Sequence, residues 1–262
     1  MKIILHADDF GFDEDTTKAT IELLDRGVLT SATIMPKMPY TEIACNYAAH
    51  HPELSFGLHL TYVDGLEPCA DKVPSLTGPD GRFLISDEVR KKALLFKLNR
   101  NDILRESLAQ IKVLRDAGVK VSHLDSHGHL HKFPSFLLAL NDITQSSGIK
   151  KVRRVQNVFI NPHKTGVTSI LNSIFAHYIS SRFKSTDFFY MSANSLDKNW
   201  SDALLKELDL LPLNGIIEVG VHPGTSLTGE EAWRVDEYKD VIEFSEKIRK
   251  GGKHQLINWN EV

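Results

Sequence analysis

The strongest constraint on the fold of this chain is a regular alternation of short apolar runs with longer amphipathic segments. The apolar runs, which we interpret as strands, lie at residues 2–6, 31–35, 54–60, 119–124, 151–155, 187–191, 215–221 and 255–258. Helical patterns separate most of them, at residues 15–26, 40–50, 101–117, 134–147, 168–182, 201–208 and 238–249. Strands that alternate with helices predict a parallel sheet with helical crossovers.

The number of these units distinguishes two parallel architectures. About seven strand–helix units in 262 residues favour a closed or nearly closed barrel over an open doubly wound sheet. The first strand is not followed by Gly-x-Gly-x-x-Gly, which counts against a dinucleotide-binding fold. No break in composition marks a linker. We therefore predict an α/β fold in which residues 1–262 form a single-domain, distorted (β/α) barrel.

The overall composition excludes several classes of partner. The net charge is −3 and no basic block is present, so neither nucleic acid nor an anionic membrane surface is expected. No run approaches the roughly 20 apolar residues of a membrane span, and the apolar run at 2–5 is too short for a signal peptide. Cys45 and Cys69 form no CxxC pair, so a reducing, cytoplasmic location is expected.

Four of the 12 histidines gather between residues 123 and 131, where an expected strand runs out into a loop. They are His123, His127, His129 and His131. Imidazole is the commonest protein ligand for zinc and similar ions, so such a cluster indicates a metal site. The alternative is a solvated polar loop, and this segment alone favours neither interpretation.

Other polar residues also lie at the carboxyl ends of expected strands. These residues are Asp8, Asp9, His59, Arg153 and His222. Each alone has a simpler interpretation, such as a solvated turn for the two carboxylates or a buried core position for His59. In a parallel barrel, however, these ends meet on the face that forms the active site. Their joint occurrence predicts one functional site that also includes the histidine loop.

The residue types at these ends are compatible with metal-dependent hydrolysis. Side chains of neighbouring residues diverge at a strand end, so one of Asp8 and Asp9 can be a ligand and the other a base. One carboxylate and two imidazoles make an open metal site with room for water and substrate. The ion acidifies water and polarises a carbonyl oxygen. A nearby carboxylate can accept the proton of water, and an imidazole across the site can protonate the leaving group.

Four segments carry a resemblance to a known family. They are Ala7-Asp8-Asp9-Phe10-Gly11, Gly57-Leu58-His59-Leu60, the run from His123 to His131, and Glu218-x-x-x-His222-Pro223-Gly224. Together they resemble the signature blocks of the YdjC-like carbohydrate deacetylases, which include chito-oligosaccharide deacetylases and a hopanoid-biosynthesis branch. The segments occur in the family's order and extend from residue 7 to residue 224.

The resemblance implies a fold, a reaction and a set of site residues. The fold would be a distorted, TIM-like (β/α) barrel related to the polysaccharide deacetylases. The reaction would be hydrolysis of the N-acetyl group of an amino sugar, or of an oligosaccharide that contains one, with release of acetate. One divalent ion, Mg²⁺ or Zn²⁺, would be held by Asp9, His59 and His127. Asp8 would be the general base and His222 the general acid.

The same resemblance suggests contacts to substrate. Arg153 matches an arginine that the family often places after the histidine loop, where it would orient substrate hydroxyls or the acyl group. We assign His129 and His131 to substrate binding as well. Gly128 departs from members that carry another histidine there, but it is not a proposed ligand. We interpret the long polar loop at 62–87 as a substrate-facing lid or rim.

Two alternatives remain open from the sequence. The first keeps the metal but hydrolyses a phosphoester or glycosidic bond. Phosphoryl transfer favours two metals and several basic residues, whereas Arg153 and Arg154 are the one obvious arginine pair. The second is a non-catalytic sugar-binding barrel, against which the presence of Asp8 and His222 argues. The oligomeric state is open, and a homodimer is one option.

Overall fold

The computed structural model describes residues 1–160, 167–192, 199–227 and 232–262, with the backbone alone for 167–171. The strands are β1 (Lys2–Phe10), β2 (Ser31–Ile34), β3 (Ser55–Leu60), β4 (Val121–Ser126), β5 (Phe188–Met191), β6 (Ile216–Val221) and β7 (Gln255–Leu256). The α-helices are α1 (Glu14–Asp25), α2 (Thr41–His50), α3 (Ser86–Leu94), α4 (Arg100–Asp116), α5 (Pro134–Ser147), α6 (Val167–Arg182), α7 (Trp200–Leu208) and α8 (Arg234–Gly251). Short 3₁₀ helices include η1 (His127–Lys132) and η4 (Trp259–Glu261).

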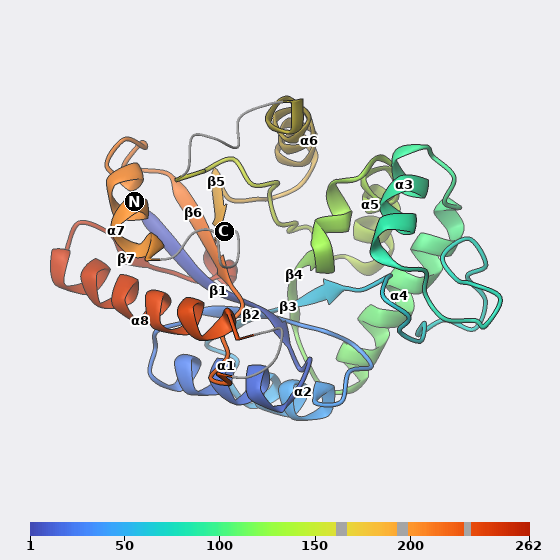
Figure 1. Cartoon of the computed structure of the whole chain (residues 1–262), viewed down its shortest axis with the longest axis horizontal. Helices are drawn as coiled ribbons and strands as arrows, with labels where there is room; N and C mark the ends of the chain where they lie inside the picture. Colours follow the sequence, from blue (N-terminus) through green and yellow to red (C-terminus); the bar gives the residue numbers. More distant parts are fainter. Residues whose placement is uncertain (161–166, 193–198, 228–231) are drawn as a thin grey trace.

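The strands form one parallel sheet that curls into a distorted barrel. Six strands are hydrogen-bonded in the order β4-β3-β2-β1-β6-β5, and β7 pairs with β1. The pairings between these strands are all parallel. Figure 1 shows α1, α2 and α8 along one side of the sheet, and α3, α4 and α5 grouped together beyond β3 and β4. The predicted α/β barrel with helical crossovers is therefore confirmed.

Residues 151–158 bridge the gap between the two edge strands, β4 and β5. On one side, the Arg153 amide donates to a β4 carbonyl at 2.9 Å. On the other side, the amides of Asn157 and Val158 both donate to the Phe189 carbonyl of β5 at 3.2 Å. The strand expected at 151–155 is reduced to isolated bridges, because the segment crosses from one edge to the other and runs beside neither for long. This crossing closes the barrel and makes it irregular.

The inner strands have the burial expected of a parallel sheet that is covered on both faces. β2 and β3 are buried along their whole length, and β1 is buried after its first residue.

The helix ends follow local signals. The Asp13 side chain accepts from the Thr16 amide at 2.8 Å where α1 begins, and Gly148 (φ 75°) ends α5. None of the helices described is both long and apolar enough to cross a membrane.

The polar segment at 62–87 is more firmly packed than its many turn residues suggest. Its apolar side chains that are buried in the core include Val73, Leu76 and Phe83. The Glu106 carboxylate of α4 accepts hydrogen bonds from the amides of Cys69 and Ala70, each at 2.9 Å. The segment ends by entering α3, a helix that the sequence pattern did not predict. Hydrogen bonds to Glu106 therefore hold the middle of this loop against α4. Its role as a lid or rim stays a prediction.

Candidate metal centre

The end of β1 sends its two carboxylates in different directions. The pairing of β1 with β2 slips between Ala7 and Phe10, and Asp9 has a left-handed backbone (φ 60°) within this irregularity. A left-handed residue with a Cβ costs about 1–2 kcal/mol, and such strained residues cluster at functional sites. Asp8 consequently contacts Arg153 in the barrel interior, whereas Asp9 reaches the ends of the neighbouring strands.

The three ligands suggested by the sequence converge at the ends of β1, β3 and β4. Asp9 Oδ1 lies 3.4 Å from His59 Nε2 and 3.1 Å from His127 Nδ1. Donors that share one ion at about 2.0–2.2 Å lie roughly 3–3.5 Å apart, so this donor set fits a divalent ion. The His127 side chain is 31% exposed, whereas those of Asp9 and His59 are 2% exposed. The group therefore opens to solvent on the His127 side.

A cation from the last long helix anchors Asp9. Arg234 Nη2, at the start of α8, donates to Asp9 Oδ2 at 2.8 Å. The guanidinium also lies over the rings of Phe12 and Trp233, at 5.7 and 5.0 Å from their centroids. Burial raises the pKa of Asp9, but the charge and hydrogen bond of His127 outweigh it and hold that pKa well below its usual range. Asp9 is thus an ionised carboxylate with one oxygen anchored and the other facing two imidazoles.

Arg153 forms the floor of the site. Its Nη1 and Nη2 bind Asp8 Oδ2 and Oδ1 at 2.8 and 2.7 Å, and Nη1 also lies 2.6 Å from Asp125 Oδ2. Nε and Nη2 donate to Glu218 Oε1 at 3.0 and 2.8 Å. These contacts engage all five N–H donors of a guanidinium, and the residue is fully buried against the Phe189 ring. Three carboxylates thus hold Arg153 below the surface, which argues against the predicted contact between Arg153 and substrate.

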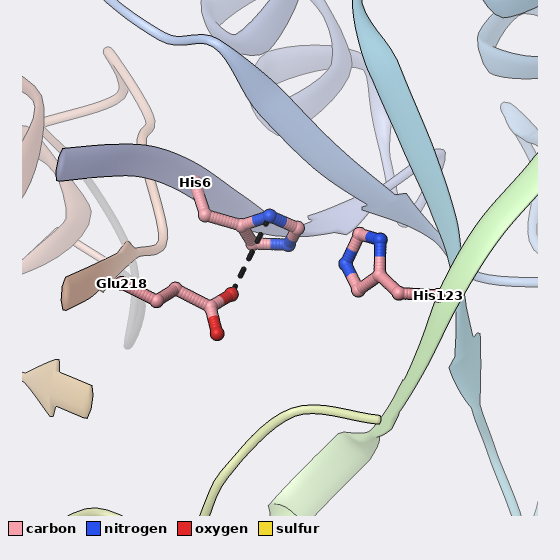
Figure 2. A group of neighbouring side chains, drawn as sticks. All are labelled: His6, His123 and Glu218. Atoms are coloured by element: carbon pink, nitrogen blue, oxygen red, sulfur yellow. Dashed lines mark ion pairs between the residues drawn. The ribbon is translucent and has the colours of Figure 1, made fainter. Parts of the chain in front are cut away.

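Among the residues that the structure describes, two further groups of donor side chains lie around Arg153. Their members are His6, His123 and Glu218 in one group and His6, Asp8 and Asp125 in the other. Figure 2 shows His6 and His123 facing each other beside the Glu218 carboxylate, whose Oε1 is 3.6 Å from His6 Nδ1. These side chains are enclosed, and Arg153 already supplies a positive charge to both groups. Of the three groups, the one built on Asp9 is best placed to exchange an ion with solvent.

Neighbouring buried charges set the protonation states of Asp8 and His59. Burial raises the pKa of Asp8, but the Arg153 guanidinium outweighs it and keeps the carboxylate ionised. Burial lowers the pKa of His59, but the charges of Asp125 and Asp8 outweigh it and raise that pKa to about 9. A metal ion at Nε2 would therefore displace a proton from His59 at neutral pH.

His222 follows β6 and lies across from Asp8. Its Nε2 is 3.9 Å from Asp8 Oδ2, while its Nδ1 is 3.3 Å from Glu237 Oε2. The Glu237 carboxylate also accepts from the His222 amide, so it fixes both the backbone and the ring. Burial lowers the pKa of His222, but the hydrogen bond and charge of Glu237 outweigh it and raise that pKa above its usual value. The half-buried imidazole is thus a favourable proton donor.

The last two predicted substrate contacts occupy different environments. His131 is buried, and its Nδ1 is 2.7 Å from the Ser126 hydroxyl. Burial, and then the charge of Arg153, lower the pKa of His131 to about 3. His129 is half-buried with a left-handed backbone (φ 54°), and its ring lies 6.0 Å from that of Phe189. The burial of His131 and its bonds to Ser126 argue against the predicted contact of His131 with substrate, and the contact of His129 stays a prediction.

Sequence reasoning missed several residues that hold the predicted ones in place. They are Asp125, Glu218, Arg234 and Glu237. Asp125 and Glu218 lie inside segments already singled out, so the alternation of β4 and β6 could have assigned them to the barrel interior. Arg234 and Glu237 lie one turn apart at the start of α8. Nothing in their local pattern distinguishes them from an ordinary polar helix face.

One protein family has a sequence model that matches most of the chain. Its model, described as YdjC-like protein, matches residues 2–247. Among curated relatives, a carbohydrate deacetylase of Geobacillus stearothermophilus is 37% identical over 142 residues, which are 54% of this chain and 55% of that protein. A carbohydrate deacetylase of Brevibacillus brevis is 39% identical over 137 residues, 52% of this chain and 53% of that protein. The chain thus spans about half the length of the curated relatives it matches.

Solved structures also include a close match to the fold. A crystal structure from Enterococcus faecalis, named for cellobiose-phosphate cleavage, superposes with a TM-score of 0.79. The match covers 99% of this chain and 98% of that one at 23% sequence identity. At this identity the likeness concerns the fold alone.

Proposed function

Because the chain belongs to the family of YdjC-like proteins, we propose that it is a metal-dependent carbohydrate deacetylase. The reaction is hydrolysis of the N-acetyl group of an amino sugar, alone or within an oligosaccharide, to acetate and a free amine. The names of the relatives from Geobacillus stearothermophilus and Brevibacillus brevis support this reaction class.

One observation carries the proposal: a carboxylate and an imidazole flank three donors of metal-ligand type. Asp9, His59 and His127 meet at the strand ends, with Asp8 beside Asp9 in the chain and His222 within 3.9 Å of Asp8. Hydrolysis of an amide requires water activation on one side and protonation of the leaving nitrogen on the other. The arrangement provides a group for each task.

The three donors would hold Mg²⁺ or Zn²⁺. When bound, such an ion lowers the pKa of water and polarises the acyl carbonyl oxygen, which allows even a weak base to act. Asp8 is such a base, since Arg153 keeps its carboxylate ionised. Asp8 accepts the proton of water as the new C–O bond to the acyl carbon forms. The bidentate contact to Arg153 holds the carboxylate in one orientation for this transfer.

His222 completes the reaction as the general acid. Glu237 binds its Nδ1 side, so that Nε2 faces Asp8 and the centre of the site. As the C–N bond breaks, Nε2 donates its proton to the departing amine. Acetate and the amino sugar then leave, and His222 regains a proton while Asp8 loses one.

Contacts to the sugar come from the rim of the site rather than from its floor. His129 is half-buried and follows the proposed ligand His127 by two residues, and Asp64 at the start of the 62–87 loop lies 4.0 Å from His127 Nε2. We keep His129 and this loop as proposed contacts to substrate. Arg153 and His131 act below them as support.

The structure weakens the alternative of phosphoester hydrolysis. All five Arg153 donors are engaged by carboxylates, and Arg234 binds Asp9. A phosphate group would therefore have to compete with buried ion pairs for these two cations. A cytoplasmic location and a homodimer remain parts of the proposal that need their own measurements.

The test is acetate release from N-acetylglucosamine, its 6-phosphate and short chito-oligosaccharides. The protein is first treated with a chelator, and Zn²⁺ or Mg²⁺ is then added back. We expect release that stops on chelation and returns with one of the two ions. Phosphate release from the 6-phosphate without acetate would favour the alternative, and tight binding without any turnover would favour a sugar-binding barrel.

A further inference from the structure

The two ring nitrogens of His59 face different carboxylates. Nε2 lies 3.4 Å from Asp9 Oδ1 on the side of the proposed metal site. Nδ1 lies 2.8 Å from Asp125 Oδ1 on the opposite side. His59 and Asp125 are directly paired across β3 and β4, so the parallel register itself brings their side chains together.

Asp125 is itself held from several directions. Its Oδ2 lies 2.6 Å from Arg153 Nη1 and accepts from the Thr33 hydroxyl at 3.0 Å. The side chain has no exposure to solvent. A carboxylate fixed in this way cannot follow the imidazole if the ring rotates, so it defines the ring orientation in which Nδ1 is hydrogen-bonded.

We propose that Asp125 is a positioning residue that keeps one proton of His59 on Nδ1 and so leaves Nε2 as the nitrogen that binds the metal ion, once the ion has displaced the proton there. A metal-ligating histidine requires this state, and a carboxylate on its other nitrogen both selects the tautomer and strengthens the ligand. The inference rests on the metal site of the proposed function. It concerns how the chain prepares that site, and it assigns no contact between Asp125 and substrate or ion.

The same carboxylate connects the metal ligand to the proposed base. Arg153 binds Asp125 through Nη1 and binds Asp8 through Nη1 and Nη2. A displacement of Asp125 therefore moves the group that orients Asp8. The ligand His59 and the base Asp8 share one buried support, which keeps the two at a constant separation.

The test is the zinc affinity of the Asp125→Asn variant, measured by competition with a chelator. The amide has nearly the same shape but lacks the charge, and loss of such an outer partner typically weakens metal binding about 10- to 100-fold. The matched control is Glu106→Gln, because Glu106 is also a buried carboxylate but its hydrogen bonds come from the amides of Cys69 and Ala70 and from the Gln110 side chain rather than from a proposed ligand. We expect wild-type affinity in the control.

A second measurement separates positioning from a general loss of structure. In the zinc-loaded protein, ¹⁵N NMR should detect a His59 Nδ1 proton shifted downfield by its charged acceptor, and Asp125→Asn should move this signal upfield. The control should leave the signal unchanged. If circular dichroism shows that Asp125→Asn does not fold, Thr33→Val is the second variant. It removes one donor to Asp125 and a contact of 3.2 Å with His59 Nδ1, and it should give a smaller loss of affinity.

Each other outcome has a defined meaning. Wild-type affinity and an unchanged Nδ1 signal in Asp125→Asn would overturn the positioning role and leave the proposed function intact. Equal losses in Asp125→Asn and Glu106→Gln would also overturn it, because they would indicate general destabilisation. Wild-type protein that binds neither Zn²⁺ nor Mg²⁺ would overturn both this inference and the proposed metal site.

Discussion

Asp8 and Arg153 form a bidentate ion pair in the interior of the barrel, with Oδ2–Nη1 and Oδ1–Nη2 distances of 2.8 and 2.7 Å. The pair joins the end of β1 to the segment that crosses between β4 and β5. It therefore connects the closure of the barrel to the orientation of the proposed base. A change at either residue should have separable effects on catalysis and on stability.

Asp8→Asn should retain the metal ion and lose most turnover. The variant keeps the shape of the side chain but cannot accept a proton, and general base catalysis typically contributes 10²- to 10⁴-fold, so a loss of about this size is expected. Acetate release and metal content measured on the same samples check this. Full activity in the variant would remove Asp8 from the mechanism.

Arg153→Met should destabilise the fold strongly. It leaves the buried carboxylates of Asp8, Asp125 and Glu218 without their shared cation, and loss of one partner of a buried pair costs about 3–5 kcal/mol. Urea unfolding measures the change.

The control for Arg153→Met is Arg100→Met. Arg100 pairs with Asp142 on the surface with half of its side chain exposed, so its loss should cost below about 1 kcal/mol. Equal losses in the two variants would contradict the structural role of Arg153.

Glu237→Gln should move the alkaline limb of the pH–rate profile to lower pH. In the proposed mechanism the acid form of His222 is the active one, so the rate should fall as pH rises through the pKa of His222. The hydrogen bond and charge of Glu237 raise that pKa against the opposing effect of burial, and the variant removes the charge. Profiles of kcat against pH check the shift. Glu243→Gln, an exposed change on the same helix, should leave the limb in place.

His131 should make the fold sensitive to acid. Its pKa is about 3 in the folded chain against 6.5 for an unperturbed imidazole, chiefly because of burial, so below pH 6.5 the unfolded chain binds a proton that the folded chain does not. Stability is therefore lost as pH falls from 6.5 toward 3, by up to about 1.4 kcal/mol per pH unit for this group. In urea titrations between about pH 7 and pH 5, His131→Gln should lose less stability than wild type. Parallel declines would contradict this assignment.

Much of the architecture could be predicted from local pattern. The apolar runs of β1 to β6 and the signals at helix ends, such as Gly148 after α5, are properties of short segments. The segment at 151–155 was predicted as a strand, but it is an irregular crossing because its hydrogen bonds go to two different strands. Helix α3 was not predicted, because it directly follows a segment rich in turn residues. Both differences arise where long-range contacts override local preference.

The candidate site also has some features that sequence order predicts and others that only the fold decides. Which residues stand at strand ends is a matter of sequence order, so Asp8, Asp9, His59 and His222 could be singled out from their positions after apolar runs. Their roles stay predictions until they are measured, but the structure brings the three suggested ligands within reach of one ion. The sequence alone could not decide whether a side chain points to solvent or into the floor.

By itself, therefore, the sequence determined the alternating units, the parallel barrel and the chemical types gathered at its open end. Only the tertiary structure decided that Arg153 is bound by Asp8, Asp125 and Glu218 rather than open to substrate. The reason is that secondary structure depends on neighbours a few residues apart, whereas the charge state and orientation of a buried group depend on partners up to 225 residues away in the chain, as for Asp9 and Arg234. Barrel closure brings those partners together, and the low polarity of the interior makes their charges decisive.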